Sequence, residues 1–108
     1  MKPARLQGSR DENHSEIVDR YEALGCTVQD LSSVGGGCPD LLVGGTSVKG
    51  RWDRLVEIKT ESGTLERNQV RFWRDWRGRK PIVVRSAEDV YAHVKIERLG
   101  METTEVDT

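Results

Sequence analysis

The 108-residue sequence contains no long apolar run and few cysteines, and each shortage excludes a class of protein. No stretch approaches the roughly 18 apolar residues that a membrane-spanning helix needs. The first residues, MKPARLQGSRDENH, include no apolar segment typical of a secretory signal. We therefore expect a cytoplasmic protein that contacts no membrane. Cys26 and Cys38 are the only cysteines and form no CxxC motif, which predicts reduced thiols rather than a disulfide framework or a zinc site.

The sequence also has little net charge. Its formal value of −1 excludes a protein that is basic over its whole surface. The charges are nevertheless segregated along the chain. From Glu66 to Lys80 there are six basic and two acidic residues, whereas Glu97 to Thr108 holds four acidic residues and one basic residue. Such segregation is what a near-neutral protein needs in order to present one face to a polyanion.

What is present is enough for one small domain. Hydrophobic residues make up 35% of the chain, which suits a single modest core at this length. The apolar spacing predicts helices and strands in the order helix, three strands, helix, strand, helix. The helices are expected over 13–24, 65–76 and 86–99, and the strands over 26–34, 40–45, 53–60 and 81–86. A turn at Lys49-Gly50 would join the second and third strands. The class is therefore α/β, with a mixed central sheet flanked by helices.

Two acidic residues are placed where a buried strand gives them no evident partner. In GGGCPDLLVG, residues 35–44, Asp40 lies at the entrance of an apolar strand. On the next strand, Glu57 and Lys59 leave one face while Ile58 points to the other. If these strands pair as a hairpin, Asp40 approaches Glu57, and two neighbouring carboxylates repel unless a cation lies between them. Carboxylates with water suit Mg²⁺ or Mn²⁺, and a nearby lysine can hold a phosphate or lower the pKa of an attacking water.

Each of these fragments also has a simpler interpretation. Asp after Pro is common in turns, and Glu-x-Lys on a strand is often only a surface ion pair. The combination is far more specific, because the two acids lie 17 residues apart on adjacent predicted strands. It is a set of groups suited to metal-assisted hydrolysis of a phosphodiester.

Basic residues follow one face of the helix expected over 65–76 and continue past its end. They are Arg67, Arg71, Arg74, Arg77 and Lys80. A solvated helix face would explain them, and so would contact with DNA phosphates. We interpret Trp73 and Trp76 on the same helix as core residues rather than as a platform for stacking bases. Trp52, beside the expected turn, could lie at a dimer contact or near DNA.

The PD at 39–40 and the EIK at 57–59 resemble the motif of the PD-(D/E)xK nuclease superfamily. A finer resemblance is to the virus-type replication-repair nuclease (VRR-NUC) domain. It rests on EIV in the first helix, the glycine-rich loop before PD, EIK itself and Gln69 early in the next helix. It covers about residues 12–95. It implies a restriction-endonuclease-like αβββαβ core in one stand-alone domain over 1–108, of the form seen in phages and bacteria. The polar residues before this core predict a loose N-terminus, and the acidic residues after it form a charged tail.

The resemblance also implies an activity, namely metal-dependent, structure-selective cutting of DNA. Stand-alone members are thought to act as homodimers on four-way (Holliday) junctions. By this resemblance Asp40, Glu57 and the backbone carbonyl of Ile58 would bind Mg²⁺ or Mn²⁺, and Lys59 would activate or orient the attacking water. The alternatives are a nuclease for flaps or duplex DNA, and a DNA-binding module that keeps the fold without the chemistry.

Two further residues are carried over from the family pattern. Glu16 matches its acid on the first helix, with Glu12 as the next candidate, although the helix dipole also explains acids at this position. His14, two residues before Glu16, is a candidate for a peripheral role in the same site. Gln69 would support Lys59 or contact a phosphate, although a helix surface also explains a polar residue there.

Overall fold

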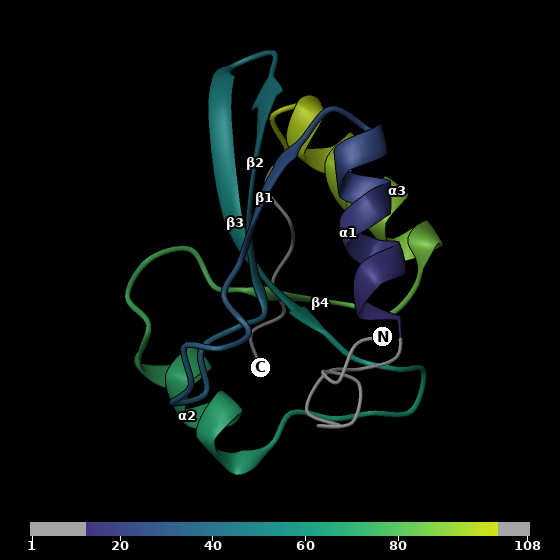
Figure 1. Ribbon diagram of the computed structural model, residues 1–108. Helices are drawn as coiled ribbons and strands as arrows, with labels where there is room; N and C mark the ends of the chain where they lie inside the picture. The colour runs from purple at the N-terminus through teal and green to yellow at the C-terminus, as the bar shows by residue number, and fades with distance from the viewer. Residues whose placement is uncertain (1–12, 102–108) are drawn as a thin grey trace.

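The computed structural model describes residues 13–101, in which three helices accompany a four-stranded sheet (Figure 1). The expectations for the N-terminus, for Glu12 and for the tail beyond residue 101 lie outside these residues. The elements are α1 (His14–Ala23), β1 (Thr27–Asp30), β2 (Leu41–Ser47), β3 (Gly50–Ile58), α2 (Arg67–Asp75), β4 (Ile82–Val84) and α3 (Ala87–Arg98). Their order is the predicted one. Among the helices of residues 13–101, none combines the length and the apolar character that crossing a membrane requires.

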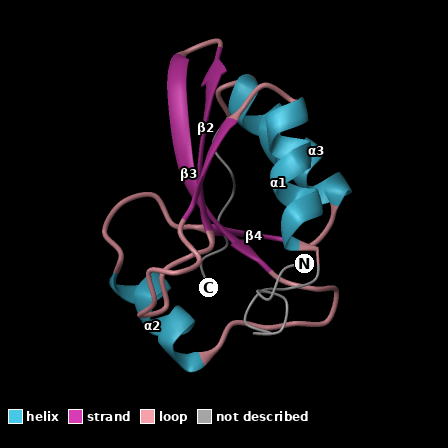
Figure 2. Cartoon of the chain, viewed as in Figure 1, coloured by secondary structure: helices cyan, strands magenta, loops and turns pink. Residues whose placement is uncertain are grey.

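The strands are ordered β1-β2-β3-β4, and the sheet is mixed, as the sequence predicts. β1 to β3 are successive antiparallel neighbours, and β4 lies parallel to β3. A parallel pair needs a crossover connection, and α2 lies within the one from β3 to β4. α1 and α3 lie side by side along the sheet, whereas α2 stands apart at its other end (Figure 2).

The core lies between the sheet and the pair α1 and α3. Alternation along β3 buries Val56 and Ile58 on this side, where Ile17 of α1 and Val90 of α3 complete the packing. Ser86 is the N-cap of α3, because the backbone N–H of Asp89 donates to its Oγ.

Trp52 belongs to this core. Its burial leaves it available neither for a dimer contact nor for contact with DNA, the two roles considered for it from the sequence. Its exposed fraction is 9%, and its ring packs edge-on against His93 with centroids 5.3 Å apart. It also lies over its cross-strand neighbour Gly45, where an added Cβ would meet the indole at 2.6 Å. A glycine is needed at this position because the indole occupies the space of a side chain.

Two details differ from the sequence-based expectations. The hairpin turn falls at Val48-Lys49, one residue earlier than expected, and Gly50 begins β3 at φ +124°. The interpretation of Trp73 and Trp76 as core residues is wrong. Trp76 is 41% exposed, and Trp73 is only half-buried on α2, a helix without a fully buried residue. The physical reason is the position of α2, which lies beyond the end of the sheet instead of across its face (Figure 1).

Candidate functional site

The ends of β2 and β3 bring Asp40 beside the Glu57–Lys59 segment. The antiparallel register pairs Leu41 with Val56, so one residue further on Asp40 lies opposite Glu57. At this point the ladder ends, and the backbone N–H of Ile58 donates to Asp40 Oδ2 at 2.8 Å. The carboxylate thus takes the place of a missing strand partner, which fixes its position against β3.

Glu57 is the buried member of the pair, with an exposed fraction of only 2%. Its Oε2 accepts a hydrogen bond from Gln69 Nε2 at 2.9 Å. The same oxygen lies 3.9 Å from Lys59 Nζ. Burial of a carboxylate is costly unless dipoles and charges compensate it, and these two side chains supply both. Gln69 was expected to support Lys59 or contact a phosphate; here it supports Glu57.

The orientation of Gln69 is set by the start of α2. Its Oε1 accepts from the backbone N–H of Glu66 at 2.8 Å, in a reciprocal capping arrangement in which the Glu66 side chain accepts from the backbone of Gln69. One amide group therefore caps the helix with its oxygen and holds the carboxylate with its nitrogen.

The glycine-rich loop is in contact with the same turn of α2. Gly37 is buried with φ +82°, and an added Cβ there would lie 2.2 Å from the backbone oxygen of Asn68. Only glycine allows this approach together with this backbone conformation. The loop that delivers Asp40 to the sheet thus also seats the helix that delivers Gln69.

Cys38, next in this loop, was not singled out as a site residue by the sequence. Burial raises the pKa of its thiol, and the negative charges of Glu57 and Asp40 raise it further. Both carboxylates therefore act electrostatically on the loop. The sequence could have indicated this proximity, because Cys38 lies only two residues before Asp40.

The start of α1 contributes two residues to the same end of the sheet. Asn13 Nδ2 donates to the backbone oxygens of Lys59 and Arg85, at 3.2 and 3.0 Å. His14, which is 4% exposed, lies with Nε2 3.1 Å from Asp30 Oδ2. Asn13 ties the ends of β3 and β4 together, a role missed because an asparagine before a helix suggests only an N-cap.

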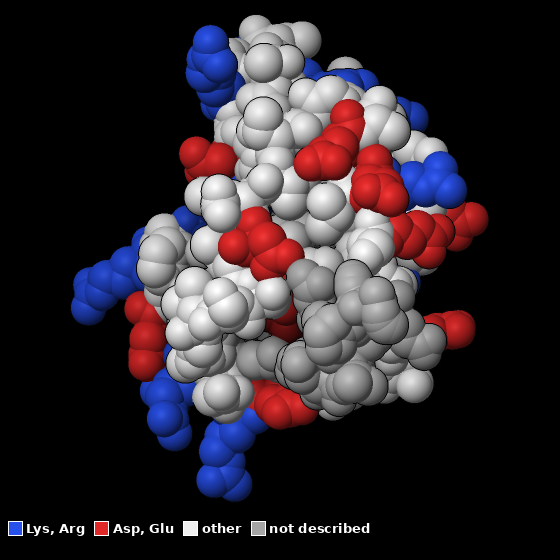
Figure 3. Space-filling view, viewed as in Figure 1, with Lys and Arg blue, Asp and Glu red and all other residues white. Residues whose placement is uncertain are grey.

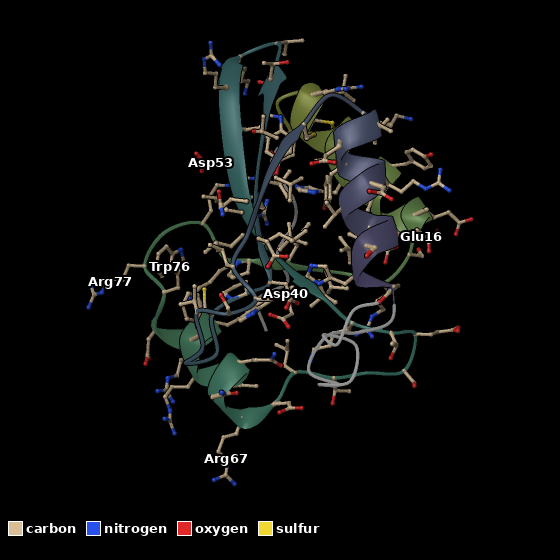
Figure 4. The ribbon with its side chains drawn as sticks, in the orientation of Figure 1. Glu16, Asp40, Asp53, Arg67, Trp76 and Arg77 are labelled. Atoms are coloured by element: carbon tan, nitrogen blue, oxygen red, sulfur yellow. The ribbon has the colours of Figure 1, made fainter. Side chains whose placement is uncertain are left out.

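The structure does not bring Glu16 to this site. The inner face of α1 is taken by His14, Ile17 and Tyr21, and the helical repeat then turns Glu16 outward. Its side chain is exposed and points away from Asp40 (Figure 4). The spacing of the apolar residues Ile17 and Tyr21 in the sequence already indicates that Glu16 lies off the buried face.

The basic residues of the α2 region are four exposed arginines and one lysine that binds the helix end. Arg67, Arg71 and Arg77 are exposed, and blue side chains project around this end of the molecule (Figures 3 and 4). Arg74 is also exposed but is bonded to Asp75 at 2.8 and 3.2 Å. Lys80 differs, because its ammonium donates to the carbonyls of Trp73 and Trp76 and so caps the C-terminal end of α2.

The donor set fits a small divalent cation. Carboxylate oxygens of Asp40 and Glu57 are hard ligands, and Mg²⁺ is commonly held by one or two carboxylates with several waters. In a strand the N–H and C=O of one residue point to the same neighbour, so the Ile58 carbonyl is directed to the side of Asp40. Residues 13–101 include no cluster of three His, Cys, Asp or Glu side chains suited to a metal ion. A cation here would rely on this carbonyl and on water for its remaining ligands.

Chemically, the arrangement places two carboxylates, a lysine and an amide at one end of the sheet. Such a set can bind a cation, orient a water and accept a phosphate group. In comparisons with protein-family models, curated proteins and solved structures, nothing matches this chain.

Proposed function

We propose that this protein is a Mg²⁺- or Mn²⁺-dependent endonuclease that hydrolyses phosphodiester bonds of DNA. The observation that carries the proposal is the hydrogen bond from the Ile58 N–H to Asp40 Oδ2, which holds one carboxylate beside Lys59 and the buried Glu57. An aspartate that only forms a turn does not need a buried carboxylate beside it, and a surface ion pair does not need to be buried. A protein that only binds DNA does not need this set of carboxylates and lysine either.

Each side chain has a distinct part in the proposed reaction. Asp40, Glu57 and the Ile58 carbonyl would hold the cation, which when bound polarises the phosphate and lowers the pKa of a coordinated water. Gln69 fixes the orientation of Glu57 through its 2.9 Å hydrogen bond. Lys59 lies with its ammonium 3.9 Å from Glu57 Oε2, where it would orient the attacking water and offset negative charge on the phosphate.

DNA is the favoured substrate because of the charge around α2. The exposed Arg67, Arg71 and Arg77 form a basic surface on a chain whose net charge is only −1. Arginines of this kind contact phosphates and so recognise backbone shape rather than sequence. We therefore propose that the enzyme is selective for DNA structure, with four-way junctions as the main candidate.

We further propose that a homodimer acts on the junction. One domain of 108 residues covers little of a branched DNA, and paired cuts in two strands need two sites. Light scattering of the protein with and without a junction tests this part. A monomer under both conditions would remove the junction-resolving role and leave a nuclease that makes single cuts.

The activity is tested on end-labelled four-way junction, flap, duplex and single-stranded DNA, in Mg²⁺, Mn²⁺ and EDTA. We expect metal-dependent, symmetric cuts in the junction that disappear with Asp40→Asn. The matched control is Asp53→Asn, because Asp53 is an exposed acid on the same strand as Glu57 but distant from Asp40 (Figure 4). This control should cut as the wild type does.

Other outcomes select the alternatives. Cuts in the flap or duplex only would keep the nuclease and exclude the junction-resolving role. Binding of DNA without cleavage in any metal, equal in wild type and Asp40→Asn, would overturn the enzyme in favour of a non-catalytic DNA-binding module.

A further inference from the structure

A hollow of about 400 Å³ lies between the glycine-rich loop and α2, on the same loop that delivers Asp40. It is lined by Gly36, Asn68, Arg71, Phe72, Asp75 and Trp76. The next residue, Gly37, contacts Asn68, and Asp40 follows three residues later. One short loop segment therefore connects the hollow to the carboxylate pair.

One wall of the hollow is aromatic. The rings of Phe72 and Trp76 are stacked, with centroids 5.2 Å apart and planes at 13°. Trp76 nevertheless keeps 41% of its surface exposed, so this flat pair is accessible to a ligand. In Figure 4, Trp76 and Arg77 lie on the segment that follows α2, and the Arg77 side chain projects outward from it. A flat aromatic surface beside basic residues is the combination on which nucleic-acid bases stack.

The polar side chains around this wall match the parts of a nucleotide. Arg71 lines the hollow and can contact a phosphate, with Arg67 one turn earlier on the helix. The Asp75 carboxylate, held by Arg74, can accept from the amino group of a base. A second copy of the chain fits this surface poorly, because it would place the same arginines against one another.

We propose that the hollow takes one unpaired nucleotide of the DNA, with its base stacked on Trp76 and its phosphate against Arg71. The inference rests on the proposed function and specifies its substrate as branched DNA in which one nucleotide beside the cut is unpaired, or is drawn out of its pair at the junction. A base inside a duplex has both faces covered by its neighbours, whereas an unpaired base at a branch point is free to stack on protein. Structure selectivity then follows without any reading of sequence.

Binding is measured apart from cleavage, by fluorescence anisotropy of labelled oligonucleotides in Ca²⁺ or EDTA. The probes are a single-stranded oligodeoxycytidylate, whose base carries an amino group, and a blunt duplex of equal length, each bound to the full chain. We expect Trp76→Ala to weaken binding of the single strand about tenfold or more and to change duplex binding less than about twofold. Trp76→Phe, which keeps a ring, should retain most of the affinity.

The matched control is Tyr91→Ala, because Tyr91 is an aromatic residue of similar exposure, 44%, on α3. It should leave both affinities unchanged. If Trp76→Ala fails to fold by circular dichroism, Arg71→Gln provides the second variant, with the same expected loss on the single strand. Unchanged single-strand affinity, or an equal loss on single strand and duplex, would overturn the inference.

The two proposals fail in different ways. If the wild type cuts DNA in Mn²⁺ but single-strand binding is indifferent to Trp76, the inference is wrong and the nuclease stands. If binding depends on Trp76 but no substrate is cut, the nucleotide site is supported and the proposed endonuclease is overturned.

Discussion

At the scale of single residues, Gln69 connects the helix to the carboxylate pair. Its amide oxygen accepts from Glu66 and its amide nitrogen donates to Glu57, so a flipped amide would lose both hydrogen bonds. The side chain therefore has one stable orientation. The position of the buried carboxylate depends on it directly.

We predict that Gln69→Ala lowers kcat/KM for DNA cleavage about tenfold, because Glu57 loses the donor that orients it. The same change should cost about 1 kcal/mol of unfolding free energy through the lost helix cap. Cleavage kinetics and denaturant unfolding measure the two effects. Loss of stability with full activity would show that Gln69 serves only as a cap.

For Glu16 we predict the opposite result. Glu16→Gln should leave cleavage unchanged within about twofold, because the side chain is exposed on the outer face of α1. The measurement is cleavage of the same substrate at matched metal concentration. A large loss of activity in a folded variant would mean that the site extends to this face of α1, against its placement here.

The residues of the site differ in how far the sequence predicts them. The alternation along 53–59 and the short hairpin set the strand register, and the register places Asp40 opposite Glu57. The link from Gln69 to Glu57 depends on where α2 lies, which no local pattern specifies. The contacts of Asn13 with Lys59 and of His14 with Asp30 join residues of different elements, and no local pattern predicts them either.

At the scale of elements, α2 differs from α1 and α3 because none of its residues is fully buried. The contacts that position it include Gly37 against Asn68, Gln69 with Glu57, and Lys80 on the last carbonyls of the helix. Its contribution to the site therefore depends on its contact with the glycine-rich loop.

We predict that Gly37→Ala displaces α2 and abolishes cleavage. An alanine there adds a clash with the Asn68 backbone to the cost of a left-handed conformation, about 3 kcal/mol in all. Gly35→Ala is the control, because Gly35 has φ +85° but nothing within 4 Å of an added Cβ. It should cost about 1 kcal/mol and keep activity; equal effects in the two variants would rule out the contact as the cause.

The order and type of the elements follow from periodicity, which is why they could be predicted. The environment of α2 could not. Its aromatic residues at helical spacing predict an apolar contact, but they do not specify whether the partner is the sheet, a loop or a ligand. Trp76 was assigned to the core for this reason, and its exposure corrects that assignment.

At the scale of the whole molecule, a buried polar network joins α1, β3 and α3. Tyr21 O–H donates to His93 Nδ1 and His93 Nε2–H donates to Glu97 Oε2, each at 2.8 Å. Arg54 and Arg79 donate to the same Glu97 oxygen. Burial lowers the pKa of His93, although Glu97 opposes this shift. For Glu97, burial alone would raise the pKa, but hydrogen bonds from Arg79 and His93 outweigh it and lower the pKa.

These shifts predict how stability depends on pH. Because the folded state holds His93 neutral, its contribution is complete above its ordinary pKa of about 6.5 and declines below it, as the unfolded chain takes up the proton. Glu97 contributes above its ordinary pKa of about 4.3, and that part is lost at lower pH still. Denaturant unfolding should therefore show free energy falling between pH 6.5 and 5, by at most about 1.4 kcal/mol per pH unit from this group.

The control for the first decline is His93→Gln, which keeps a polar side chain but cannot titrate. Its unfolding free energy should be flatter between pH 6.5 and 5 than that of the wild type. An identical slope in the two proteins would assign the decline to other groups.

The most direct test of the proposed site is cleavage of a four-way junction by Lys59→Ala beside the wild type in Mn²⁺, with junction binding measured in Ca²⁺. We predict that Lys59→Ala binds within about threefold of the wild type but cuts at least a hundredfold more slowly, because its role lies in the chemical step. Cleavage by Lys59→Ala at the wild-type rate would contradict the assignment of Asp40, Glu57 and Lys59 as the site of hydrolysis.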